Sequence, residues 1–158
     1  MTESLEEALG AHRFFAGLPE GTTTLVAGCV RRVNFETGEL LLSEGAPADT
    51  LHLVEQGRVA IEIHRPAQGS LVIETVESGH VVGLSWVSPP FRWHFDARAL
   101  EPVTTLAIDS ECLRTQLGQN PVIGYALLER LSSMLLERLQ ATRVRLLDLY
   151  GLGDDHPH

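Results

Sequence analysis

The side chains best suited to chemistry lie between residues 77 and 102. This segment holds two histidines, His80 and His94, which are candidate metal ligands. They do not have the i, i+4 spacing that brings two ligands to one helix face, and no third ligand is obvious. We therefore predict no metal site.

Nothing else in the sequence has the pattern of a catalytic centre. There is no paired nucleophile and base and no phosphate loop of the Gly-x-x-x-x-Gly-Lys type. Cys29 and Cys112 are the two cysteines of the chain and lie far apart. They are too few for a disulfide framework or a self-contained zinc site, so we expect two reduced, buried thiols. The sequence thus predicts a protein that is not an enzyme.

The elements that position this segment are predicted to be strands. From Val30 to Ile108, short β-rich runs alternate with glycine signals. Apolar and polar residues alternate with a period of two in Val59–Ile63 and in Leu71–Val76, as in strands with one buried face. Several short strands with regular turns indicate a sandwich or a barrel-like roll. The runs are VNF, ELLL, TLHLVE, RVAIEIH, SLVIETV, DARAL and VTTLAI.

Helices are predicted on both sides of this roll. Ser4 and Glu7 form a capping box for a short helix, and a helical turn follows near residues 22–27. After Ile108, a short helix is expected to about residue 117, and Pro121 then begins a long one that ends near Tyr150. We therefore expect a helical segment in residues 1–28, a β-roll in 29–110, helices in 111–150 and a disordered tail in 151–158.

The order of these features resembles the cyclic-nucleotide-binding domains of the catabolite-activator (Crp/Fnr-like) branch. The stretch FETGELLLSEGAPADTLHLVEQGRVAIEI carries Gly38, Gly45 and Gly57 at its turns, and ESGHVVG resembles the entry to the phosphate-binding cassette. The segment QNPVIGYALLERLSSMLLERLQATRVRLLDLYG resembles the hinge and dimerisation helix. The resemblance covers about residues 12–150. It implies a mainly β fold, an eight-stranded jelly-roll-like β-roll with flanking helices, and cAMP or cGMP as ligand.

The resemblance also implies roles for cassette residues. In the family, a glutamate holds the ribose hydroxyl and an arginine pairs with the phosphate. Here the glutamate position falls on Leu84, and the arginine position falls on Trp93, with Arg92 immediately before it. Leu84 cannot accept a hydrogen bond and Trp93 cannot neutralise a phosphate, so the cassette is altered. Gly83 and Ser85 lie where backbone and hydroxyl donors would meet a phosphate.

Three further residues leave alternatives open. A shift of one residue would bring Arg92 inward, because side chains along a strand alternate between faces. Thr142 either bonds a purine, as the resemblance implies, or is an interface residue on the long helix. A protonated His94 would donate to an anion and make binding depend on pH.

Aromatic residues are concentrated in the same segment, although they make up 6% of the chain. One interpretation is core packing and a lid over the cassette. The other is a pocket that has become apolar and takes a flat hydrophobic ligand, a differently substituted nucleotide, or nothing. The residues are Trp86, Phe91, Trp93 and Phe95.

Charge and periodicity bear on partners. The formal net charge of −9 disfavours direct DNA binding, and the arginines near residues 130–145 alternate with acidic residues, as on a solvated helix face. No helix-turn-helix domain is expected before the chain ends at His158. No apolar run is long enough for a membrane span, and the acidic start is not a secretory signal, so we expect a cytoplasmic protein.

The long helix carries an apolar stripe that predicts a homodimer. The interface residues expected are Leu128, Leu131, Leu135, Leu139 and Leu146. Two functions remain at this point. One is a small-molecule-sensing regulatory module, and the other is a degenerate domain that binds no cyclic nucleotide and acts as a dimeric protein-interaction module.

Overall fold

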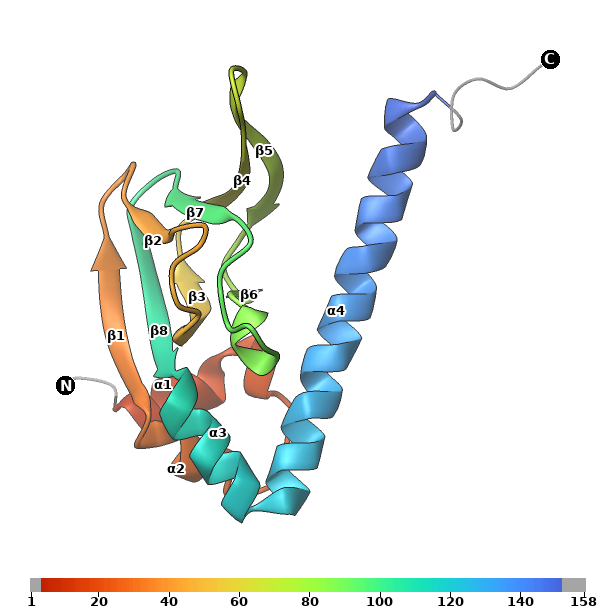
Figure 1. Cartoon of the computed structure of the whole chain (residues 1–158). Helices are drawn as coiled ribbons and strands as arrows, with labels where there is room; N and C mark the ends of the chain where they lie inside the picture. Colours follow the sequence, from red (N-terminus) through yellow and green to blue (C-terminus); the bar gives the residue numbers. More distant parts are fainter. Residues whose placement is uncertain (1–3, 152–158) are drawn as a thin grey trace.

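Two four-stranded antiparallel sheets face each other and form the roll in a computed structural model that describes residues 4–151 (Figure 1). The first sheet has the order β1-β8-β3-β6 and the second the order β2-β7-β4-β5. The fold is mainly β with flanking helices, as predicted. The strands are β1 Val30–Phe35, β2 Leu40–Leu42, β3 Thr50–Gln56, β4 Val59–Arg65, β5 Gly69–Val76, β6 Val81–Val82, β7 Asp96–Ala99 and β8 Val103–Asp109.

Seven of these strands coincide with the runs expected from periodicity. The eighth, β6, has two residues and is too short to show a period. The core lies between the sheets, where residues such as Leu51, Leu53, Leu106 and Val59 are fully buried. At the turn between β3 and β4, a Cβ on Gly57 would lie 2.4 Å from the Pro102 carbonyl oxygen, so this turn requires glycine.

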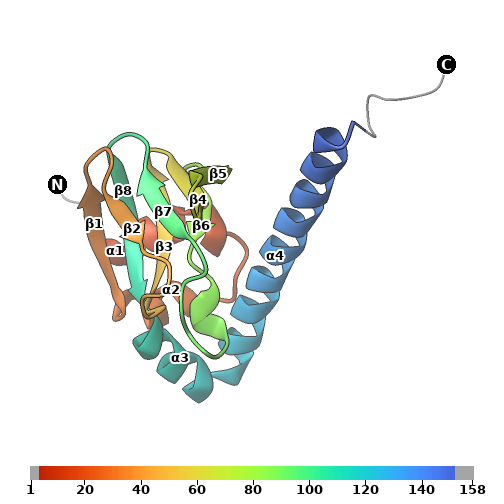
Figure 2. The ribbon, with the colours of Figure 1, turned by 45° about the horizontal axis from the view of Figure 1, so that its top comes forward.

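Helices cover the base and one side of the roll (Figures 1 and 2). The Glu7 amide donates to the Ser4 hydroxyl oxygen, and the Ser4 amide donates to the Glu7 carboxylate. These two hydrogen bonds confirm the capping box. Asp109 caps α3, and Pro121 begins the long helix α4. The bounds are α1 Leu5–Ala11, η1 Arg13–Phe15, α2 Thr22–Ala27, η2 Ser85–Val87, α3 Ser110–Gln119 and α4 Pro121–Leu149. Among residues 4–151, no helix has the length and apolar character needed to cross a membrane.

The prediction of two reduced thiols is wrong in this structure. Cys29 and Cys112 form a disulfide, with an S–S distance of 2.00 Å and Cα atoms 5.6 Å apart. Sequence spacing could not indicate this pair, because Cys29 ends the segment after α2 while Cys112 lies in the first turn of α3, and only the fold brings them together. The predicted disordered tail, apart from Gly151, lies outside the described residues.

Candidate functional site

The cassette predicted from the sequence runs from the end of β6 through η2 to β7. Gly83 follows β6 with a φ of +98°, a conformation that favours glycine. The 3-10 helix η2 then carries Trp86 into the core, where the residue is 1% exposed. Beyond the prolines that follow, Arg92 forms an isolated β-bridge with Pro47, which returns the chain to the roll.

Trp93 occupies the inner side of this cassette. It is 3% exposed, and two atoms of its indole ring lie 2.8 and 3.1 Å from the place where a Cβ on Gly83 would stand. Its backbone donates to the Ala46 carbonyl (3.0 Å) and accepts the Gly45 amide (2.9 Å). The ring is therefore packed directly on the glycine of the cassette, at the position where the resemblance expects a phosphate-pairing arginine.

Arg92 and His94, on either side of Trp93, are exposed. This is the alternation of an extended segment, which turns Trp93 inward and its two neighbours outward. Arg92 donates to the Gly45 carbonyl oxygen (3.2 Å), so its guanidinium lies on the outer surface. The shift that would bring Arg92 inward is absent here.

Leu84 and Ser85, at the start of η2, are partly buried, and Leu84 packs against the core. Leu84 and Trp93 therefore both turn apolar side chains toward the core on the inner side of this segment.

Thr142 lies on the exposed C-terminal half of α4. Its hydroxyl donates to the Arg138 carbonyl of its own helix (2.9 Å), a common use of threonine within helices. The residue of α4 that does reach the cassette entry is Arg138, whose guanidinium donates to the Val81 carbonyl of β6. Both roles considered for Thr142, a contact to a purine and a place at an interface, stay predictions.

Three arginines of α4 hold the helix against the roll. Arg130 donates to the Ala16 carbonyl (2.6 Å) and to the Phe14 carbonyl, both near η1. Arg138 and Arg145 donate to carbonyls of β6 and β5, the last strands of the two sheets. Because edge strands expose unpaired carbonyl groups, these arginines cover both open edges on one side of the roll. The interpretation of this charged stretch as a solvated face is wrong for Arg130 and Arg138, which are partly buried, whereas Arg145 is exposed.

An ion pair with Glu74 also helps to hold Arg138 of α4 against the roll. Glu74 of β5 lies 3.8 Å from its guanidinium. Burial lowers the pKa of Arg138, and the Glu74 carboxylate opposes that shift. A partly desolvated guanidinium with a carbonyl and a carboxylate as partners is a strong, directional attachment.

A cleft of about 460 Å³ opens beneath α4. Arg13 and His80 contribute positive or titratable groups to its walls, and Glu77 and Glu137 contribute carboxylates. Neither this cleft nor a smaller one beside α1 is lined by the cassette residues 83–94.

A model of the cyclic nucleotide-binding domain matches residues 32–120. This chain belongs to the cyclic nucleotide-binding domain family. The match runs from β1 to the end of α3 and so includes the whole roll and the cassette.

Relatives of known description include a CRP-like regulator and an acetyltransferase. The CRP-like cAMP-activated global transcriptional regulator of Mycobacterium tuberculosis H37Rv is 23% identical over 92% of this chain, which spans 63% of that regulator. Acetyltransferase Pat of Mycolicibacterium smegmatis is 32% identical over 52% of this chain and 25% of its own length. A crystal structure assigned to the cyclic nucleotide-binding proteins, from Geobacter metallireducens GS-15, is 27% identical with a TM-score of 0.75, covering 88% of this chain and 99% of that one.

The sequence analysis of this cyclic nucleotide-binding domain did not identify Arg114 as a residue that contacts the cassette. Arg114 of α3 donates to the Trp86 carbonyl (2.7 Å), and its guanidinium lies 4.8 Å from the centre of the Phe91 ring. It therefore fixes both η2 and the loop after it. An arginine two residues after Cys112 gives no sequence signal of this role, because its partners lie more than twenty residues earlier in the chain.

The predicted dimer stripe divides into two groups. Leu131 is 3% exposed and packs in the core of its own chain, so it cannot form part of an intermolecular surface without unfolding. The other four remain exposed on one side of α4, at 45–50%. They are Leu128, Leu135, Leu139 and Leu146.

Proposed function

We propose that this chain is a non-catalytic, dimeric regulatory module of the cyclic nucleotide-binding family whose cassette is closed to cAMP and cGMP. The observation that carries the proposal is the indole of Trp93 packed on Gly83. A cyclic nucleotide placed there would have to displace a buried tryptophan. It would gain neither a carboxylate for its ribose nor a guanidinium for its phosphate, and a buried phosphate without a cation is strongly disfavoured.

Dimerisation through α4 is the second part of the proposal. Leu128, Leu135, Leu139 and Leu146 recur at intervals of seven, four and seven residues, which places them along one side of the helix. Exposed leucines at this spacing match a second copy of the same helix, so a two-fold dimer would bury them. In this module, a protein partner or the dimer itself carries the regulatory signal.

Titration of the full chain with cAMP and cGMP, to millimolar concentration, tests the closed cassette. The two tryptophans of the chain, Trp86 and Trp93, both belong to the cassette, so their fluorescence reports on this site. We expect no heat of binding and no change in emission. Heat together with a shift in emission would show that the nucleotide displaces Trp93 and would overturn the proposal.

The cleft beneath α4 supports a second candidate function, ligand sensing away from the cassette. Its volume of about 460 Å³ is within the range of small-molecule sites. Walls from both the roll and α4 mean that an occupant would bias the position of the helix. The guanidinium of Arg13 and the carboxylates of Glu77 and Glu137 suit a zwitterionic ligand.

A second titration, with free lysine as a zwitterionic probe, separates the two functions. Binding heat with unchanged tryptophan emission is expected for an occupant of the cleft, and Glu137→Gln should then weaken binding. Thr142→Ala is the matched control, because Thr142 is on α4 but does not line the cleft. Equal loss of affinity in both variants would contradict binding at this cleft.

A further inference from the structure

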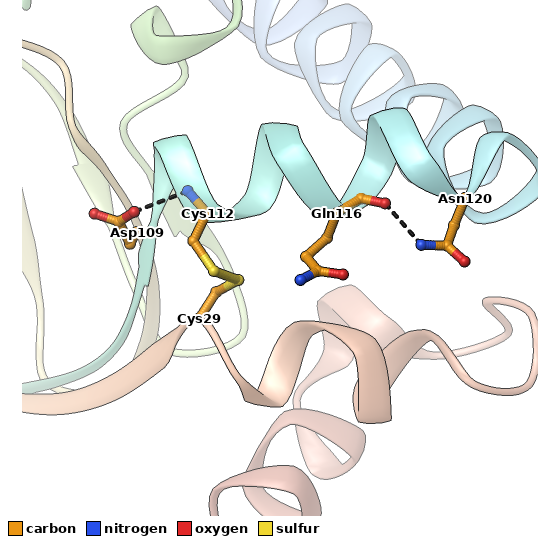
Figure 3. The surroundings of a disulfide bond; sticks show 5 residues. All are labelled: Cys29, Asp109, Cys112, Gln116 and Asn120. Carbon is orange, nitrogen blue, oxygen red and sulfur yellow. Dashed lines mark hydrogen bonds between the residues drawn. A yellow bond between two sulfur atoms is a disulfide. The ribbon is translucent and has the colours of Figure 1, made fainter.

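The disulfide joins two places that each begin a structural element. Cys29 immediately precedes β1, and Cys112 lies in the first turn of α3 (Figure 3). The same turn is fixed by Asp109, whose carboxylate accepts the Cys112 amide (2.8 Å) and whose own amide donates to the Cys29 carbonyl (2.9 Å). The covalent bond and the two hydrogen bonds therefore hold the start of α3 against the start of β1.

From this fixed start, α3 reaches the cassette. Arg114 follows Cys112 by two residues and donates to the Trp86 carbonyl, with its guanidinium over Phe91. These contacts hold η2 and the loop that leads to Trp93. The position of α3 thus decides whether Arg114 can keep the cassette closed.

The other end of α3 sets the position of α4. A Cβ on Gly124 of α4 would lie 2.8 Å from the Leu117 carbonyl, so the two helices are in backbone contact there. The Asn120 amide group, at the junction, donates to the Gln116 carbonyl (2.9 Å; Figure 3). With one residue between the helices, a displacement of α3 moves the start of α4 as well.

We propose that the Cys29–Cys112 disulfide is a redox-controlled clamp on α3, which holds the cassette closed and α4 docked while it is oxidised. This regulation goes beyond the proposed function and does not depend on whether any nucleotide binds. A disulfide with a partly exposed cysteine is open to thiol–disulfide exchange, and this one joins a buried residue, Cys29 (8% exposed), to the half-buried Cys112.

The reductant in the proposal is a small or protein dithiol. Its thiolate attacks the Sγ of Cys112, the more exposed cysteine, and the Cys29 thiolate leaves. The second thiol of the reductant then displaces Cys112 from the mixed disulfide. Two electrons pass to the protein, the two cysteines take up the two protons, and the dithiol becomes a disulfide. The start of α3 is then held by its hydrogen bonds and by the packing of Leu113, without a covalent bond.

Hydrogen exchange of the full chain, oxidised or treated with dithiothreitol, tests the clamp. The chain has two cysteines, so the reductant has one target. We expect amides in 85–93 and 110–127 to exchange about tenfold faster after reduction, while those of β8 keep their rates as a reference for global unfolding. The double variant Cys29→Ser with Cys112→Ser should show the fast rates with or without dithiothreitol.

Three results would overturn the proposal. Thiol titration of the air-oxidised protein could find two free thiols. Reduction could leave exchange unchanged in both segments. It could also accelerate β8 as much as α3, which would identify a general stabilising cross-link. Arg114→Ala in the oxidised protein separates the two arms of the clamp, because it should release residues 85–93 without changing exchange in α4.

Discussion

The two halves of α4 belong to the same helix but are attached to the roll by different physical means. In the first half, Gly124, Leu127 and Leu131 are buried. In the second half, from Leu135 to Leu149, no residue is buried, and the contacts to the roll are those of Arg138 and Arg145. The first half is therefore part of the hydrophobic core, whereas the second is positioned by polar contacts and keeps its leucines exposed.

This difference explains how one helix can serve both the fold and an interaction. Burial of apolar surface is nondirectional and costly to reverse, so the first half stays where the fold puts it. Arginine–carbonyl contacts fix geometry but can exchange with water at lower cost. The second half is thus the part of the helix whose attachment to the roll can change most readily.

The largest expected effect is in the buried half. Leu127→Ala should lower the free energy of unfolding by about 2–5 kcal/mol, because it leaves a cavity among packed side chains. Leu127 is 1% exposed. Leu136→Ala, 61% exposed and outside the leucine stripe, is the matched control and should change it by less than about 1 kcal/mol. Urea unfolding monitored by circular dichroism measures both, and equal losses would remove the distinction between the halves.

Acid should lower the free energy of unfolding of the roll by protonating its buried histidines. Burial lowers the pKa of His52 to about 4, and its Nδ1 lies 2.9 Å from the Thr105 hydroxyl. Burial also lowers the pKa of His12. A depressed pKa means that the unfolded chain takes up protons first, so stability is full above about pH 6.5 and falls as the pH drops toward 4. The loss from His52 is on the order of 3 kcal/mol.

Unfolding curves at pH 7.5, 5.5 and 4.5 measure this dependence. His52→Gln should flatten the curve between pH 6.5 and 4, whereas His64→Gln, at an exposed position of β4, should keep it. A wild-type protein equally stable at pH 7.5 and 4.5 would contradict the role given to burial of His52.

Removal of one arginine contact should act on the second half of α4 alone. Arg138→Ala should speed amide exchange in residues 135–149 by roughly five- to thirtyfold, because a partly buried charged hydrogen bond contributes about 1–2 kcal/mol locally. Arg143→Ala, exposed on the same half, is the control and should leave these rates unchanged. If both variants behave alike, the arginine contacts do not position the helix.

Substitutions in the leucine stripe should change the stability of the single chain least, and they test the proposed dimer most directly. Leu135→Glu or Leu139→Glu should give monomers in sedimentation velocity, with an unchanged circular dichroism spectrum, because both side chains are already exposed in the single chain. Val144 is 58% exposed on the side of the helix opposite the stripe, so the control variant Val144→Glu should remain dimeric. An identical sedimentation profile for all variants and the wild type would refute the interface.

Local signals were sufficient to predict most of the elements. The period-two alternation of β4 and β5, the capping box at Ser4 and the proline at the start of α4 depend on neighbours within a few residues. The ordered glycines and the cassette were enough to indicate the family, whereas the roles given to Leu84 and Trp93 stay predictions. These features depend on local backbone geometry, which the sequence encodes directly.

Contacts between segments that are distant in the sequence were decided only by the tertiary structure. Cys29 meets Cys112 across 83 residues, Arg114 meets Trp86, and Arg138 meets Val81. Leu131 and Leu135 have the same residue type on the same helix, yet the roll buries one and leaves the other exposed. Sequence periodicity shows that a helix has an apolar side, but it does not show which surface covers each residue, because that depends on how the sheets and helices pack.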